Sequence, residues 1–203
     1  MQAFCYDEHM EERLNDLKLF ITHRAAQSDF VHHKWFTRWH LEVVESLARD
    51  LVVFYPEADK DIIIAMCWMH DYGKIIDFDN QYDHKYIEEG RQEMIKLGFD
   101  EFFATTVTEN IKTLDQKDNL VNANIETRIV SSVDGCSHLV GPFLSLYWWE
   151  NPKTPFEDIM RENVRKLTVD WDLKVVLPEA KAAYQTLHDN AMDRAIGKIL
   201  KIQ

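Results

Sequence analysis

The sequence predicts an all-α protein, and three observations support this fold class. Apolar residues recur at helical spacing along most of the chain, and the one short alternating stretch, 173–177, is bounded by charge and Pro178. Hydrophobic residues form 46% of the 203 residues and aromatic residues 12%, which is enough for a substantial core. Six glycines and five prolines are too few for long linkers, so we expect a single domain over 1–203.

The first half of the chain should contain three long helices. The first is predicted at about 7–27 and the second at about 35–54, which stops before Pro56 because the residue preceding a proline is disfavoured in the α region. The third is predicted at about 57–72. Gly73 should end it as a left-handed residue and leave Lys74 just beyond the helix.

The second half should also be helical, with polar breaks between its elements. A helix at about 84–97 should close at Gly98, and Asp100 has the side chain and position of an N-cap for a helix at about 101–114. After the polar stretch 119–124, the remaining helices are predicted at about 124–139, 144–149, 155–171 and 179–201.

Charge and cysteine content narrow the class of protein. Lys and Arg total 23 against 35 Asp and Glu, a formal net charge of -12, which argues against a general nucleic-acid-binding surface because phosphate backbones require a positive field. A small anionic substrate would need local positive groups or a metal ion. Cys5, Cys67 and Cys136 are odd in number and widely spaced, which argues against a disulfide framework and favours a reducing cytoplasm.

Membrane association is not expected. The first residues are acidic and lack the basic and apolar regions of a secretory signal, and no stretch approaches 18 uninterrupted apolar residues. We therefore expect a cytoplasmic protein.

Four ionisable residues lie on faces that otherwise read as core. His40, His70, Asp71 and Asp134 are each three, four or seven residues from apolar side chains on predicted helices. Taken singly, such a histidine is usually satisfied by backbone carbonyls, and such an aspartate is often an N-cap or an arginine partner. Burying unpaired carboxylates costs several kcal/mol, so the group of four favours a divalent cation as their partner.

The order and surroundings of these residues resemble the HD-domain superfamily of metal-dependent phosphohydrolases, whose pattern is H…HD…D. The stretch that begins at His40, HLEVVESLA, resembles the family's first-histidine helix, and HDYGK at 70–74 resembles its HD-x-G-K variant. The stretches DHKYIEEG at 83–90 and SSVDGCSH at 131–138 resemble the two motifs that follow. The similarity covers about residues 25–145, and the flanking helices match no family that we recognise.

The resemblance implies that His40, His70, Asp71 and Asp134 bind one divalent ion inside a helical bundle. Nitrogen donors favour Mn, Fe, Co, Ni or Zn over Ca. It also implies hydrolysis of a phosphate ester or anhydride, perhaps in a nucleotide, by metal-bound water that Asp71 or Asp134 orients. A non-catalytic module that binds a metal or ligand is the alternative.

Two further residues are candidates for the site through the resemblance. Lys74 would bind a substrate phosphate and neutralise developing charge, although a solvated lysine at a helix C-terminus is the ordinary alternative. His84 would contact the phosphate, donate a proton or bind a second metal, although an exposed histidine at a helix start is as ordinary.

The chain also departs from family patterns in two places. Two-metal members carry a further histidine after the position of His84, and the helix predicted at 101–114 has none, which argues against a dinuclear site and against the di-iron oxygenase branch. In the mononuclear 5'-nucleotidase branch, a catalytic acid occupies the position where Lys74 stands here.

Overall fold

The computed structural model describes residues 8–117 and 119–198, and it confirms the all-α fold class. Every regular element in these two ranges is helical. Cys5 and the last residues of the final predicted helix lie outside the described residues, whereas Cys67 and Cys136 are buried free thiols.

The elements follow one another with short connections. The α-helices are α1 Glu8–Ala25, α2 Glu42–Leu51, α3 Lys60–Met69, α4 Tyr72–Ile76, α5 His84–Lys96, α6 Glu101–Gln116, α7 Ile125–Ser137, α8 Phe143–Glu150, α9 Phe156–Val169 and α10 Pro178–Ala195. Two π-helical turns, η1 Thr37–Leu41 and η5 Asp170–Lys174, and three 3-10 turns, η2 Val52–Phe54, η3 Phe78–Asn80 and η4 Leu120–Asn122, complete the order.

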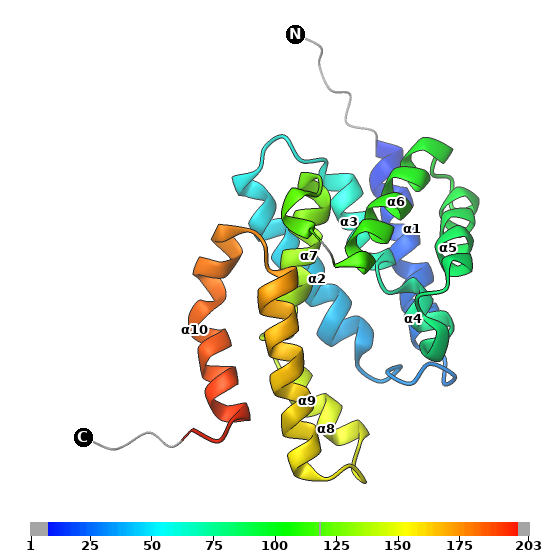
Figure 1. Ribbon diagram of the computed structural model, residues 1–203. Coiled ribbons are helices and arrows are strands. Elements are labelled where there is room, and N and C mark those ends of the chain that lie inside the picture. Colours follow the sequence, from blue (N-terminus) through cyan, green and yellow to red (C-terminus); the bar gives the residue numbers. More distant parts are fainter. Residues whose placement is uncertain (1–7, 118, 199–203) are drawn as a thin grey trace.

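The helices pack around a central group of α2, α3 and α7. Figure 1 shows α1, α5 and α6 on one side of this group and α9 and α10 on the other, with α8 at the lower end. Fully buried side chains such as Leu17 on α1, Ile63 on α3 and Ile129 on α7 fill the space between these helices. The core is therefore continuous across the helices that carry the four candidate ligands.

The second predicted helix contains an irregular turn at its candidate ligand. His40 lies in the π-helical turn η1, and α2 continues directly from Glu42. π-Turns inside helices are rare and occur often at functional sites. The extra residue in this turn changes the direction in which the His40 side chain points. The hydrophobic pattern of the sequence did not predict this π-helical turn.

The third predicted helix is broken in the middle of its motif, so the expected bounds of 57–72 are wrong. Helix α3 ends at Met69, Asp71 leaves the helical region with φ -108° and ψ 18°, and α4 then begins at Tyr72. Neighbouring residues in a continuous helix point about 100° apart. The break allows the adjacent side chains of His70 and Asp71 to face the same point.

We predicted that Gly73 would end a helix in a left-handed conformation, and this prediction is wrong. It lies inside α4, together with Lys74, and the glycines with positive φ are Gly98, Gly141 and Gly197. A Cβ at Gly73 would lie 2.3 Å from the carbonyl oxygen of Gln81. The glycine is needed because the following loop passes close to the helix.

The stretch 173–177 is not a strand. Lys174 ends the turn η5, and the backbone N–H groups of Val176 and Leu177 both donate to the Ser132 hydroxyl on α7, at 3.1 Å. Helix α7 thus supplies the hydrogen-bond acceptor that a neighbouring strand would provide. Asp100, in contrast, caps α6 as predicted, by accepting a hydrogen bond from the Phe103 N–H at 2.9 Å.

None of the helices in the described ranges has both the length and the apolar character needed to cross a membrane.

Candidate metal centre

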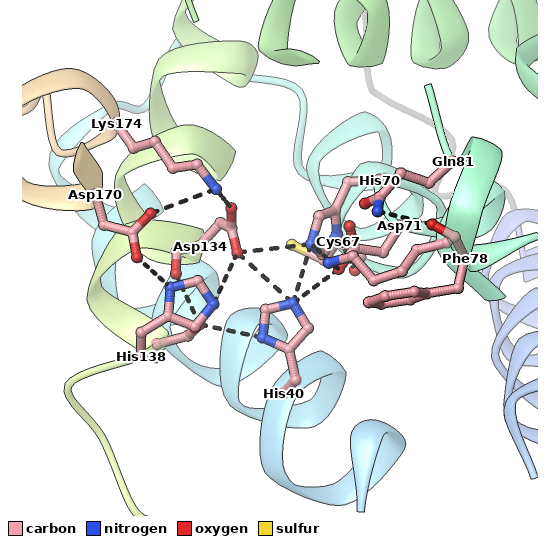
Figure 2. A network of polar contacts seen from close by, with 12 residues as sticks. His40, Cys67, His70, Asp71, Phe78, Gln81, Asp134, His138, Asp170 and Lys174 are labelled. Atoms are coloured by element: carbon pink, nitrogen blue, oxygen red, sulfur yellow. Dashed lines mark hydrogen bonds and ion pairs between the residues drawn. The ribbon is translucent and has the colours of Figure 1, made fainter. Parts of the chain in front are cut away.

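Side chains from four separate elements meet at one point between α2, α3 and α7. Nε2 of His40 lies 3.2 Å from Nε2 of His70 and 3.2 Å from Oδ2 of Asp71. Oδ1 of Asp134, on α7, lies 3.6 Å from the first of these nitrogens and 3.7 Å from the second. Figure 2 shows the two imidazoles and the two carboxylates pointing toward one another. The structure thus brings together all four residues that the sequence singled out as metal ligands.

The hydrogen bonds of the two imidazoles fix their neutral tautomers, in which each Nε2 carries a lone pair. Nδ1 of His70 lies 3.0 Å from the carbonyl oxygen of Cys67, which can only accept, so this nitrogen carries the hydrogen. The Ser137 hydroxyl donates to the Asp134 carbonyl at 2.7 Å and therefore accepts from Nδ1 of His40 at 3.3 Å. Two nitrogen lone pairs and two carboxylate oxygens consequently face the same small volume.

This donor set fits one transition-metal ion. With metal–ligand bonds of about 2.1 Å, neighbouring ligand atoms lie about 3.0 Å apart in an octahedral site and about 3.4 Å apart in a tetrahedral one. The separation of the two imidazole nitrogens and their separations from the carboxylate oxygens, 3.2 to 3.7 Å, are close to these values. Two imidazoles and two carboxylates would balance a divalent charge, and the nitrogen donors favour first-row transition metals.

Two lysines compensate the negative charges of the two carboxylates. Nζ of Lys74 lies 2.6 Å from Oδ2 of Asp71, and Nζ of Lys174 lies 2.5 Å from Oδ2 of Asp134. Burial opposes ionisation of each aspartate, but the facing lysine and His70 outweigh it and hold the pKa of both carboxyls well below the usual range. Both aspartates are therefore ionised near neutral pH, as metal ligands must be.

The two histidines differ in their electrostatic surroundings. Burial lowers the pKa of His40 below its ordinary value, which favours the neutral ligand form. Burial acts in the same direction on His70, but the charges of Asp71 and Asp134 outweigh it and raise its pKa. In the absence of an ion, a proton on His70 is thus favoured by the two carboxylates and adds to the charges of Lys74 and Lys174.

A third histidine, His138, also lies beside the ligand cluster, and we did not predict it. Nε2 of His138 lies 3.8 Å from Oδ1 of Asp134, and its Nδ1 lies 2.7 Å from Oδ2 of Asp170 on η5. Burial, together with the charge of Lys166, lowers the pKa of His138 to about 3, so it is neutral. The signal was its position four residues after Asp134, on the same face of one helix.

Asp115 is a second residue that we missed. It lies near the end of α6, one residue beyond the predicted end of that helix, and lines a cavity together with His70, Asp71 and Asp134. Burial and the negative charge of Asp71 raise its pKa to about 6. A carboxyl with such a pKa in a cleft is a candidate for proton transfer.

The ligand cluster lies between two cavities. One, of about 310 Å³, has largely aromatic walls, which include Trp35, Phe36, Phe78, Phe143 and Tyr147. The other, of about 210 Å³, is polar, and Lys117 and Lys174 contribute to its wall. Lys74, His138, Arg165 and Lys166 line both cavities and mark the boundary between them.

The two predicted substrate-binding residues lie in different surroundings. Lys74 reaches the ligand cluster from α4 and lines both cavities. His84 is the exposed first residue of α5 and lines neither of them. We therefore keep Lys74 as a candidate and leave His84 out of the site.

Comparison with known proteins gives one distant relative. The chain is 25% identical over 176 residues to the 3'-5' exoribonuclease YhaM of Shouchella clausii. The match covers 83% of this chain but only 43% of the relative, so the chain spans less than half of that protein's length. The relative's name concerns RNA, which fits poorly with our expectation of no general nucleic-acid binding. No protein-family model and no solved structure matches the chain.

Proposed function

We propose that this protein is a metal-dependent phosphohydrolase of the HD type, with His40, His70, Asp71 and Asp134 holding one divalent transition-metal ion. The observation that carries the proposal is the meeting of two imidazole nitrogens, 3.2 Å apart, with two ionised carboxylates that each lie 3.2 to 3.7 Å from both nitrogens. The distant relative is named as an exoribonuclease, an enzyme that cleaves phosphodiester bonds, and this supports the same class of chemistry.

The residues of this chain divide the work between them. An ion bound by the four ligands would lower the pKa of a water molecule or polarise a phosphoryl oxygen. Asp71 and Asp134 would hold the ion in place and supply the negative charge that offsets it. Lys74, whose ammonium lies at the boundary of the two cavities, is positioned to neutralise the charge that develops on the phosphate.

The two cavities support a substrate with a phosphate joined to an apolar or aromatic group. The cationic side chains are concentrated around the polar cavity, where Lys74, Lys117 and Arg165 suit an anion. The aromatic walls of the other cavity suit a ring, because flat side chains stack favourably on it. A nucleotide meets both requirements and is the first substrate class to test.

Cleavage of RNA from its 3' end is a second candidate, favoured by the name of the relative. The net charge of -12 leaves little positive surface for a long strand, but the cationic groups at the cavities suit a few nucleotides at a chain end. The substrate for this candidate is a short single strand that enters the cavities end first.

The proposal is tested by loading the purified protein with Mn²⁺, Co²⁺ or Ni²⁺ and measuring release of phosphate from an aryl phosphate and from nucleoside monophosphates, and release of nucleotides from short RNA oligomers. We expect hydrolysis that requires metal and is abolished in Asp71→Ala, with the far-UV circular dichroism spectrum retained. His84→Ala is the matched control and should hydrolyse like the wild type, because His84 is exposed and lines neither cavity. A protein that binds metal but releases nothing from any of these substrates would instead be a non-catalytic metal-binding module.

A further inference from the structure

We infer that His138 is a fifth protein ligand of the ion, and that Asp170 holds its imidazole in the orientation that binding requires. The inference rests on the metal site of the proposed function, but it does not depend on which reaction that site performs. It adds to the site a residue outside the H…HD…D pattern.

The orientation of the His138 ring follows from its hydrogen bond. Its Nδ1 lies 2.7 Å from Oδ2 of Asp170, and Nζ of Lys166 lies 3.0 Å from the same oxygen, so a buried ion pair holds this group as a carboxylate. An ionised carboxylate can only accept, so Nδ1 of His138 carries the hydrogen. Nε2 is thus left with a free lone pair, as in His40 and His70.

This nitrogen lies at nearly the same distance from Oδ1 of Asp134 as those of the two predicted histidine ligands. Oδ1 of Asp134 lies 3.6 Å from Nε2 of His40, 3.7 Å from that of His70 and 3.8 Å from that of His138. When the three rings are neutral, each Nε2 presents a lone pair toward this oxygen, as metal ligands do. His40, Asp134 and His138 also offer ligand atoms that lie within 4.8 Å of one another, and the rings of the two histidines are parallel at 5.3 Å.

The surroundings of His138 have the arrangement that metal-binding histidines usually have. A ligand histidine commonly donates its other N–H to a carboxylate, which fixes its tautomer and raises its basicity. Asp170 is itself held, because Nζ of Lys166 lies 3.0 Å and Nζ of Lys174 lies 3.7 Å from its carboxylate oxygens. Figure 2 shows this chain running from Lys174 and Asp170 to His138, and from there to Asp134.

A fifth ligand changes what the ion can do. Three imidazoles and two carboxylates would fill five of the six positions of an octahedral ion and leave one for water or a phosphoryl oxygen. Three nitrogen donors also shift the preference further from Mg²⁺ and Ca²⁺ toward first-row transition metals. The protein should therefore bind Co²⁺, Ni²⁺ or Zn²⁺ much more tightly than Mg²⁺.

The test counts the histidines bound to the ion and needs no substrate. In the proton NMR spectrum of the Co²⁺-loaded protein, the ring N–H of each bound histidine gives a strongly shifted signal that disappears in D₂O. We expect three such signals in the wild type, because Nδ1 of each ring donates within the protein and is protected from rapid exchange. We expect two in His138→Gln, with an affinity for Co²⁺ at least about 10-fold lower.

His32→Gln is the matched control for this experiment. His32 lines the same aromatic cavity and also pairs its Nδ1 with a carboxylate, that of Glu150 at 2.6 Å, but it belongs to neither group of potential ligands. This variant should keep all three signals and the wild-type affinity.

The possible outcomes separate the inference from the proposed function. Two shifted signals in the loaded wild type would overturn the role of His138 and leave the four-residue site intact. Failure to bind Co²⁺ at all would overturn both. Because the wild-type count decides the question, the test holds even if His138→Gln folds poorly.

Discussion

Oδ1 of Asp134 is the atom at which the contacts of individual residues converge. Three imidazole nitrogens lie 3.6 to 3.8 Å from it, while Oδ2 of the same carboxylate is paired with Lys174. One carboxylate therefore has a side turned to the metal site and a side turned to a buried cation. This division lets Asp134 remain ionised although it is only 3% exposed, since a buried charge is tolerated where it is paired.

At the same scale, Asp115 should contribute to turnover without holding the ion. Its raised pKa of about 6 allows it to exchange a proton near neutral pH, and it lines the cavity that contains Asp71 and Asp134. We predict that Asp115→Asn lowers kcat by about 100-fold, the lower range for loss of a general acid or base, and leaves the metal content unchanged. Steady-state kinetics and elemental analysis check this.

Asp79→Asn is the control for that experiment, because Asp79 is an exposed carboxylate in the 3-10 turn η3. It should have wild-type kcat and metal content. A kcat for Asp115→Asn within twofold of the wild type would show that the raised pKa has no part in the reaction.

Among the helices, the decisive features are the places where regularity is interrupted. His40 lies in a π-turn, the His70–Asp71 pair lies at the break between α3 and α4, and Asp170 and Lys174 lie in a second π-turn. Each interruption turns a side chain toward the site. Helices α3, α5, α6 and α7, in contrast, begin at side-chain caps, as at Asp100.

This contrast explains which parts of the structure could be predicted from the sequence. The helices and the Asp100 cap follow from local spacing and side-chain chemistry, and His40, His70, Asp71 and Asp134 were found because each interrupts an apolar stripe. Lys174 and Asp115 could not be found in this way. They reach the site only through the packing of η5 and α6 against other helices, which no local pattern records.

The break after α3 gives a prediction about helix packing. Because a Cβ at Gly73 would lie 2.3 Å from the backbone oxygen of Gln81, Gly73→Ala must move the loop that follows α4. We expect the free energy of unfolding to fall by about 1–3 kcal/mol, the usual cost of overpacking, with a weaker affinity for metal because α4 carries Lys74 next to Asp71. Chemical denaturation and Co²⁺ titration measure both effects.

Gly90→Ala provides the comparison, since it places a Cβ at 2.8 Å from a methyl group at the flexible end of Met69 rather than from backbone. The side chain can turn away, so this variant should lose clearly less stability and keep its affinity for metal. Equal losses in the two variants would mean that the contact with Gln81 does not control the position of α4.

For the whole molecule, charge is distributed unevenly in a way that suits an anionic substrate beside the candidate metal site. The chain carries a formal net charge of -12, yet five cationic side chains line the polar cavity together with its four aspartates. The ligands come from η1, from the break between α3 and α4, and from α7, so the ion would join elements that are distant in the sequence. Metal binding should therefore stabilise the complete fold rather than a single segment.

The size of this stabilisation should depend on pH. In the ion-free protein, burial lowers the pKa of His70, but Asp71 and Asp134 outweigh it and raise the pKa above 6.5. Since the folded value exceeds the unfolded one, protonated His70 stabilises the ion-free protein at pH values below 6.5, and this contribution is lost as the pH rises through the raised pKa. A bound ion replaces that proton, so it should stabilise the protein more as the pH rises through this range.

We therefore predict a pH-dependent gain at one fixed concentration of Co²⁺, set to about 100 times the dissociation constant measured at the highest pH tested. At that pH the ion should raise the free energy of unfolding by about 2.7 kcal/mol. Near pH 6.5 the same concentration should raise it by less. Thermal melting with and without the ion, across a series of pH values, measures the difference. A double variant, His70→Ala with Asp71→Ala, should show no metal-dependent change at any pH. A gain that is independent of pH would mean that the ion displaces no proton from His70, and that the balance of charge at the site is held by the lysines instead.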